Sequence, residues 1–266
     1  YLKKNNIHLT HNDLIVDLGC GPGNISEKLS KEWPNTSVIG IDGSKEMIKK
    51  AESRKNSQEK SLLEVAKEIR EFSSKEKKGF FTEQFENTAN RSFHERTTGQ
   101  EILKQTNYEV DAFICSVGTG GTIGGVSRAL KNYDTNIKVF LADPPGSALH
   151  SFIQRGELLA EGSSVTEGIG IGRITPNFAD SPVDDSIYIE DLHSIRMVYH
   201  LLNKEGFLLG STSGVNVFGA YKLALKLGPG STIVTILCDS GSRYLSRLFN
   251  PEWLNEKHLD VSSPFH

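Results

Sequence analysis

The fold is decided by the stretch Cys115-Ser116-Val117-Gly118-Thr119-Gly120-Gly121-Thr122. The run before it, Val110-Asp111-Ala112-Phe113-Ile114, is short, apolar and bounded, which is typical of a central strand in a parallel sheet. After the glycines, residues 123–130 carry apolar side chains at helical spacing. The sequence therefore predicts a buried strand, a tight turn and a helix.

The turn has the composition of an anion-binding site. Its glycines let the backbone fold closely around a phosphate, and the N–H groups and dipole of the following helix attract negative charge. The hydroxyls of Thr119 and Thr122 add donors. The alternative interpretation is a strand-to-helix turn that holds no ligand.

Length and composition limit the remaining possibilities. A chain of 266 residues can form one large or two small domains, and its net charge of -3 without long runs of one sign argues against a nucleic-acid partner. No apolar run reaches membrane-spanning length. Cys20, Cys115 and Cys238 lack metal-type spacing, so we expect three small core residues, no metal site and a reducing, cytoplasmic location.

Residues 14–57 have the pattern of a βαβα unit. We expect strands at Leu14–Leu18 and Val38–Ile41, each followed by a helix. Between the first strand and helix lies Asp17-Leu18-Gly19-Cys20-Gly21-Pro22-Gly23, where alternate glycines let the backbone approach a nucleotide-like ligand. Asp42 ends the second strand and can accept hydrogen bonds from two ribose hydroxyls.

This segment resembles the first two motifs of class I S-adenosylmethionine-dependent methyltransferases. The resemblance implies that Asp17, Gly19 and Gly21 border the cofactor and that Asp42 holds its ribose. A dinucleotide site is disfavoured, because the Gly-x-Gly-x-x-Gly spacing is not met. The resemblance stops near Arg54, and the later strands of such an enzyme are not found.

A second series of motifs extends from residue 84 to residue 244. In chain order it comprises Gln84-Phe85-Glu86-Asn87-Thr88-Ala89-Asn90, Thr97-Thr98-Gly99-Gln100-Glu101-Ile102, the Gly118–Thr122 turn, Leu141-Ala142-Asp143-Pro144-Pro145-Gly146-Ser147, Glu161-Gly162-Ser163-Ser164, Glu167-Gly168-Ile169-Gly170, Gly210-Ser211-Thr212-Ser213-Gly214 and Leu237-Cys238-Asp239-Ser240-Gly241-Ser242-Arg243-Tyr244. Together these motifs resemble the fold-type II pyridoxal-phosphate enzymes, in particular cysteine synthase and its relatives. The resemblance covers residues 61–254.

The expected architecture follows from the alternation of buried strands and helices. Residues 137–141 and 232–237 are runs rich in β-branched and other apolar residues, typical of strands covered on both faces. We therefore expect a three-layer α/β fold with a mostly parallel sheet. An N-terminal Rossmann-like βαβα unit, residues 1–57, would be joined to the large-domain half of a fold-type II pyridoxal-phosphate enzyme, residues 58–266.

The resemblance implies a role for each motif. The cofactor phosphate would be held by Gly118, Thr119, Gly120, Gly121 and Thr122. Gln84 would face the substrate amino acid, and Gly168 would line the active-site wall. Either Asp239 or Ser240 would contact the pyridine nitrogen, although both residues could instead cap a turn. His94 is interpreted as a surface or supporting histidine rather than a base.

One part of the family pattern is missing, and it bears directly on activity. The resemblance implies a lysine that binds the cofactor covalently and moves the substrate's α-proton, followed by Asp-Arg, and also a Ser/Thr-Gly-Asn-Thr-Gly loop for the substrate carboxylate. Neither motif is found in this sequence, so no catalytic residue is predicted and turnover is expected to be weak or absent.

Three functions remain open at this point. The first is a cysteine synthase-like enzyme with pyridoxal phosphate, catalysing β-replacement or β-elimination on serine- or cysteine-type amino acids. The second is a methyltransferase-like binder of S-adenosylmethionine, and the third a non-catalytic gene fusion or remnant. The family resemblance also implies a homodimer, and we expect no membrane partner.

Overall fold

The structure is a computed structural model that describes residues 14–18, 37–41 and 83–265. The chain divides into two compact units, Tyr1–Glu83 and Gln84–His266, and each is described by itself. The domain boundary expected between residues 57 and 58 lies outside the described residues.

The first unit contains a pair of parallel strands, β1 (Leu14–Leu18) and β2 (Ser37–Ile41). Both strands lie where the sequence predicts them, with β2 starting one residue earlier. Asp17 is in β1 and pairs with Gly40 across the ladder. Gly19, Gly21, Asp42 and the two expected helices lie outside the described residues, so the full Rossmann-like unit is not shown.

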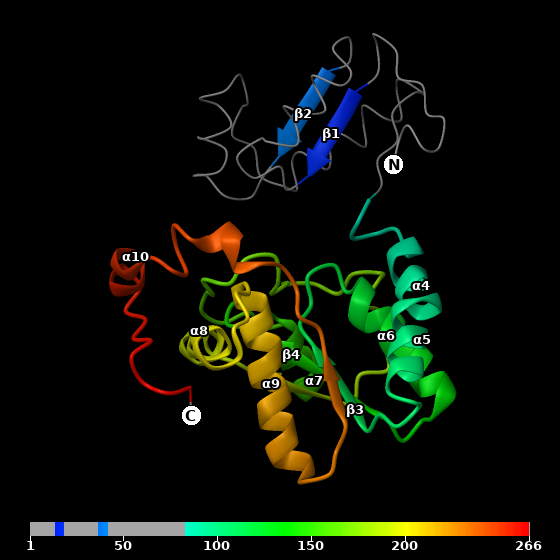
Figure 1. Cartoon of the computed structure of the whole chain (residues 1–266). Coiled ribbons are helices and arrows are strands. Elements are labelled where there is room, and N and C mark those ends of the chain that lie inside the picture. Colours follow the sequence, from blue (N-terminus) through cyan, green and yellow to red (C-terminus); the bar gives the residue numbers. More distant parts are fainter. Residues whose placement is uncertain (1–13, 19–36, 42–82, 266) are drawn as a thin grey trace. The chain divides into compact units, whose positions relative to one another are not determined.

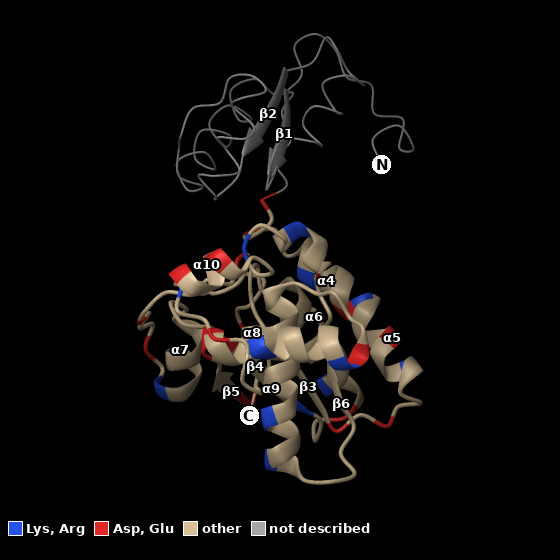
Figure 2. Cartoon of the chain, turned by 60° about the vertical axis from the view of Figure 1, so that its left-hand side comes forward, with Lys and Arg blue, Asp and Glu red and all other residues tan. Residues whose placement is uncertain are grey.

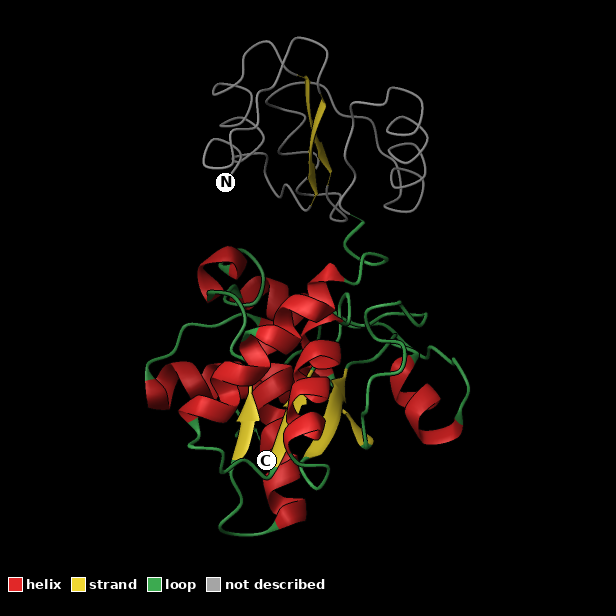
Figure 3. Ribbon diagram, turned by 90° about the vertical axis from the view of Figure 1, so that its right-hand side faces the viewer, coloured by secondary structure: helices red, strands yellow, loops and turns green. Residues whose placement is uncertain are grey.

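The second unit is built on four parallel strands in the order β5-β4-β3-β6. Figure 3 shows these strands in yellow, with helices around them. These strands are β3 (Ala112–Cys115), β4 (Lys138–Asp143), β5 (Asp185–Tyr188) and β6 (Ile233–Thr235). Because all four run in the same direction, their carboxyl ends meet at one edge, where ligands bind in open α/β sheets.

Helices flank the sheet (Figure 1). They are α4 (Ala89–Arg96), α5 (Thr98–Gln105), α6 (Gly121–Tyr133), α7 (Leu149–Arg155), α8 (Asp191–His200), α9 (Ser211–Leu227) and α10 (Pro251–Glu256). A π-helical turn, Leu201–Glu205, ends at Gly206, and a 3-10 turn covers Gly241–Tyr244. Gly228 follows the last residue of α9 as its C-cap.

The core confirms three layers in this unit. Alternate residues of β3 point to opposite faces, so Phe113 and Cys115 pack with α5, α6 and α7. Ala112 and Ile114 pack on the other side with residues of α8 and α9. Positions of positively and negatively charged residues are spread over the helices and loops of this unit (Figure 2).

Strand β6 is covered on both faces, as predicted, because Val234 packs against one core cluster and Ile233 against the other. It lies at the edge of the described sheet, since it pairs only with β3, and its three residues are half-buried. Cys238, expected in the core, is exposed after this outer strand, whereas Cys115 is buried as predicted. Cys20 lies outside the described residues.

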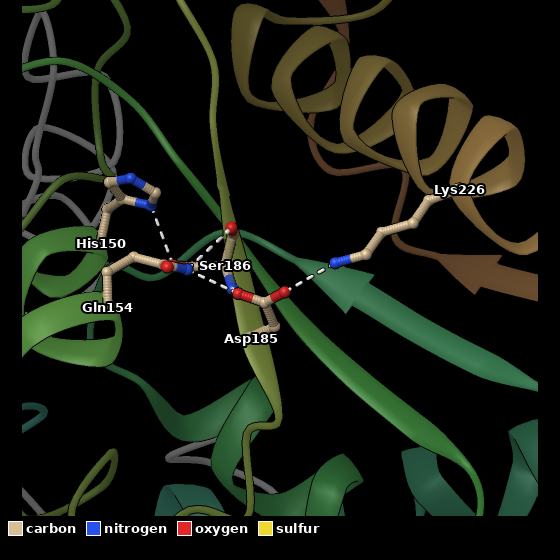
Figure 4. Close-up of polar contacts among 5 residues, drawn as sticks. All are labelled: His150, Gln154, Asp185, Ser186 and Lys226. Carbon is tan, nitrogen blue, oxygen red and sulfur yellow. Dashed lines mark hydrogen bonds and ion pairs between the residues drawn. The ribbon is translucent and has the colours of Figure 1, made fainter.

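Strand β5 was not predicted, because Asp185-Ser186-Ile187-Tyr188 lacks an apolar run. Figure 4 shows the polar contacts that hold it. The Asp185 carboxylate lies between Gln154 Nε2 at 2.5 Å and Lys226 Nζ at 2.7 Å. His150 Nδ1 lies 2.8 Å from the Ser186 hydroxyl. Side chains from α7 and α9 thus fix this strand, and its sequence alone does not show them.

None of the helices in the described ranges is long and apolar enough to span a membrane.

Candidate functional site

The glycine-rich turn connects β3 to α6, as predicted. Gly120 has a φ of +87° and directly precedes the helix, and no side chain caps the helix at this position. A left-handed φ strains residues with a Cβ atom, so this position favours glycine. The Thr119 carbonyl accepts a hydrogen bond of 2.7 Å from the Thr175 hydroxyl. The turn is therefore anchored, and the first N–H groups of a 13-residue helix lie directly behind it.

The loop with Gly168 lies against this turn. A Cβ atom added at Gly118 would overlap the Gly168 carbonyl oxygen. Gly170 N–H donates a 3.0 Å hydrogen bond to the Val117 carbonyl. Gly118 and Gly168 are 50 positions apart in the sequence, and the family resemblance assigns them to one site; the structure places them in direct contact.

The segment after β6 reaches the same sheet edge. The Asn216 amide in α9 accepts a 2.8 Å bond from Ser116 N–H and donates a 2.8 Å bond to the Ile236 carbonyl. Gly210 N–H donates to the Asp239 carbonyl at 2.9 Å. Asn216 therefore ties the segment before the turn to the segment that carries Asp239 and Ser240.

Asp239 and Ser240 have different surroundings. The Asp239 carboxylate accepts a 2.6 Å hydrogen bond from the Tyr244 hydroxyl and lies 3.8 Å from Arg243. Burial and this bond raise the pKa of Tyr244. The Ser240 hydroxyl is exposed and accepts a 3.3 Å bond from Ser242 N–H, so it caps the 3-10 turn.

Gln84 lies at the start of the second unit, before α4. It is exposed, and its carbonyl accepts a 3.1 Å hydrogen bond from the Asn177 amide. This bond fixes the backbone of the Gln84 segment, while the contact of its side chain with a substrate stays a prediction.

Two residues of α4 contact the threonines of the turn, and sequence reasoning gave neither a role there. Asn90 Nδ2 donates a 3.0 Å hydrogen bond to Thr119 Oγ1. His94 Nε2 lies 3.4 Å from Thr122 Oγ1, and burial lowers the pKa of His94. Both residues belong to the motifs around residues 84–98, but only the packing of α4 on α6 brings them to the turn.

Two further groups near this edge have shifted pKa values. Burial raises the pKa of Asp143, at the end of β4, to about 6, although the backbone N–H of His150 donates to it at 2.7 Å. Its Oδ1 has no hydrogen-bond partner among the described residues. Burial, together with the Asp239 charge, raises the pKa of the Cys238 thiol to about 11.

Comparison with known proteins supports the resemblance to the pyridoxal-phosphate enzymes. The family model described as "Pyridoxal-phosphate dependent enzyme" matches residues 43–239. Cysteine synthase 1 of Emericella nidulans is 51% identical over 191 residues, which cover 70% of this chain and 52% of that protein. Cysteine synthase 1 of Neurospora crassa is also 51% identical over 191 residues, covering 70% of this chain and 51% of that protein. The chain thus spans about half the length of the curated relatives it matches.

A solved structure agrees in fold. The O-acetylserine dependent cystathionine beta-synthase from Helicobacter pylori superposes with a TM-score of 0.66 at 25% identity, over 92% of this chain and 80% of that chain. The expected resemblance to the pyridoxal-phosphate enzymes is confirmed, whereas the methyltransferase resemblance of residues 13–54 has no such support. The chain belongs to the family of pyridoxal-phosphate dependent enzymes.

Proposed function

We propose that the chain binds pyridoxal phosphate at the carboxyl edge of the β3–β6 sheet, in the manner of a cysteine synthase-like protein. The observation that carries this proposal is the Gly118–Thr122 turn, which lies before a helix and in contact with the Gly168 loop. Its substrates would be amino acids of the serine or cysteine type, and the reaction would be β-replacement or β-elimination.

The residues present fit the phosphate of this cofactor. A phosphomonoester needs several converging donors and no nearby carboxylate. The turn offers backbone N–H groups at the start of α6 and two threonine hydroxyls, and Thr119 is fixed by Asn90 and Thr175. Phosphate binding would therefore be the task of Gly118, Thr119, Gly120, Gly121 and Thr122.

When bound, pyridoxal phosphate supplies an electron sink for chemistry at the α-carbon of an amino acid. The polar residue opposite its ring nitrogen would be Ser240. The Asp239 carboxylate is already bound by Tyr244, whereas the Ser240 hydroxyl is exposed. A neutral hydroxyl leaves the ring nitrogen unprotonated, which suits β-elimination. Gly168 would form the wall of the site, and Gln84 would face the amino acid.

Turnover by this chain would be weak or absent, because the sequence lacks the lysine motif expected to move the α-proton. The experiment supplies the full chain with pyridoxal phosphate, O-acetylserine and sulfide, and measures bound cofactor and cysteine formed. We expect bound cofactor and cysteine at the background rate. Cysteine formation at an enzymatic rate would contradict the inactivity, and absence of bound cofactor would contradict the assignment.

A second candidate function is binding of S-adenosylmethionine through Asp17, Gly19, Gly21 and Asp42. It is favoured by the parallel pairing of β1 with β2, which brings the ends of both strands to one edge. Calorimetry with S-adenosylmethionine and S-adenosylhomocysteine tests it, and the absence of heat with both ligands would remove it. If neither cofactor binds, a non-catalytic fusion or remnant becomes the better description.

A homodimer and a cytoplasmic location also belong to this proposal. The dimer rests on the family resemblance, and the compartment on the unpaired state of Cys115 and Cys238. Sedimentation of the full chain tests the first expectation.

A further inference from the structure

Side chains of helix α4 make polar contacts with the two threonine hydroxyls of the turn. Asn90 and His94 are four residues apart and so lie on one face of α4. Asn90 Nδ2 lies 3.0 Å from Thr119 Oγ1, and His94 Nε2 lies 3.4 Å from Thr122 Oγ1. This close approach depends on Gly125 of α6, where a Cβ atom would overlap the Arg91 carbonyl oxygen.

The hydrogen bonds of Thr119 determine where its proton can point. A threonine hydroxyl has two acceptor lone pairs and one proton. Its Oγ1 accepts from Asn90 Nδ2 at 3.0 Å and from Gly121 N–H at 3.4 Å. Both acceptor positions are therefore used by donors of the chain, and the proton remains to be donated to a ligand.

The Thr122 hydroxyl has a comparable contact with His94. His94 Nδ1 lies 2.8 Å from the Thr98 hydroxyl, and Nε2 lies 3.4 Å from Thr122 Oγ1. When Thr98 donates its proton to Nδ1, the neutral ring carries its proton on Nε2, which then donates to Thr122. The lowered pKa of His94 favours this neutral form. The Thr122 proton is then also free to be donated.

We propose that Asn90 and His94 are positioning residues that turn the Thr119 and Thr122 hydroxyl protons toward the phosphate of the ligand. This inference rests on the proposed function, since it concerns the same phosphate site. A mere packing role for the two residues would affect ligands with and without a phosphate group equally. A positioning role would affect only ligands that carry the phosphate.

The probes are pyridoxine 5′-phosphate and pyridoxine, which have no aldehyde, so their binding does not require a lysine. The affinity of the full chain for both is measured by calorimetry for wild type, Asn90→Ala and Asn90→Asp. We expect Asn90→Ala to weaken binding of the phosphorylated ligand about tenfold, with little change for pyridoxine. Asn90→Asp should weaken it further, because a carboxylate accepts the Thr119 proton. Asn255→Asp adds the same charge at an exposed position in α10 and serves as the control.

A double-mutant cycle separates the indirect role from a direct one. In a Thr119→Val background, Asn90→Ala should have no further effect on phosphate binding. For His94, Gln keeps a side-chain N–H donor and should retain affinity that Leu loses. Circular dichroism checks the fold of each variant, and Asn90→Asp, which keeps the side-chain shape, carries the test if Asn90→Ala does not fold.

The two proposals fail in distinguishable ways. If wild type does not prefer pyridoxine 5′-phosphate to pyridoxine, the phosphate site itself is wrong, and this inference falls with it. If wild type shows the preference and both Asn90 variants keep it unchanged, the positioning role is wrong while the proposed function stands.

Discussion

The carbonyl oxygen of Gly168 lies so close to Gly118 that it would overlap a Cβ atom added there. Two loops on one sheet edge thus pack without any side chain between them. The Gly170 N–H bond to the Val117 carbonyl, 3.0 Å long, fixes the same contact. The position of the Gly168 loop, the candidate wall of the cofactor site, therefore depends on residue 118 being a glycine.

Gly118→Ala should separate these loops. An added methyl group without space typically costs about 1 to 3 kcal/mol of unfolding free energy. Pyridoxal phosphate affinity should fall as well, because the turn and the wall move apart. Urea unfolding and calorimetry measure both effects. Gly172→Ala is the control, since a Cβ atom there meets nothing within 4 Å. Equal stability of the two variants would contradict the contact.

Ser240→Ala and Asp239→Asn should separate the two candidates for the ring-nitrogen contact. We expect Ser240→Ala to weaken pyridoxal phosphate binding several-fold and to shift the absorbance of the bound cofactor. Asp239→Asn should mainly lower stability, by about 1 kcal/mol, because it weakens the bond to Tyr244. Tyr244→Phe should show the same stability loss. A cofactor spectrum that responds to Asp239→Asn alone would reverse the assignment.

Asp143 should make the chain less stable as the pH rises from about 4 to about 6. Burial raises its pKa from 3.8 to about 6 in the folded chain, so the folded state binds the proton more tightly than the unfolded state. This stabilisation is complete below the unfolded pKa and is lost as the pH passes the folded pKa. The full change is on the order of 3 kcal/mol. Urea unfolding across this range should show the slope, and Asp143→Asn should remove it.

Asp185 should act in the opposite direction. Despite the opposing effect of burial, hydrogen bonds from Lys226, Ser186 and Gln154 lower its pKa. Its contribution is present above the unfolded pKa and is lost as the pH falls through the folded pKa. The Lys226 pair is partly exposed, so the effect should stay below about 1 kcal/mol. Asp185→Asn should leave the Asp143 slope between pH 4 and 6 in place, and its disappearance would contradict the assignment to Asp143.

Cys238 should react slowly although it is exposed. Its sulfur lies 3.6 Å from Asn216 Nδ2, and its pKa is raised to about 11. At pH 8 its thiolate fraction is then roughly a hundredfold below that of an ordinary thiol. Labelling with a disulfide reagent should follow this ratio and accelerate in Asp239→Asn. Fast labelling of wild type that is lost in Cys238→Ser would contradict it.

The sequence predicts the central part of the fold well, because there the local signals agree. The run from Val110 to Leu130 combines a bounded apolar segment, glycines and a helical period, and the structure has β3, the turn and α6 in that order. The position of a strand within the sheet was harder to predict, since it depends on the order of strands that are distant in the sequence. The β6 run is as β-branched as a central strand, but it pairs with only one strand in the described sheet.

The site was predictable where one motif carries the chemistry by itself. The glycine turn could be interpreted as a phosphate site from its residues, and the Gly168 loop was assigned through the family resemblance; the structure brings these two loops into contact. Asn90 and His94 could not, because a polar residue on a helix has no visible partner until α4 packs on α6 at Gly125. The contacts of Gln84, Gly168, Asp239 and Ser240 with a ligand stay predictions.

The most direct test of the phosphate site is a calorimetric titration of the full chain with pyridoxal phosphate and with pyridoxal. If the Gly118–Thr122 turn binds the phosphate, pyridoxal phosphate should bind saturably to one site and pyridoxal at least about a hundredfold more weakly, since several charge-assisted hydrogen bonds are lost. A Thr119→Val, Thr122→Val double variant should lose most of this difference. Equal affinity of wild type for the two ligands would contradict the central claim.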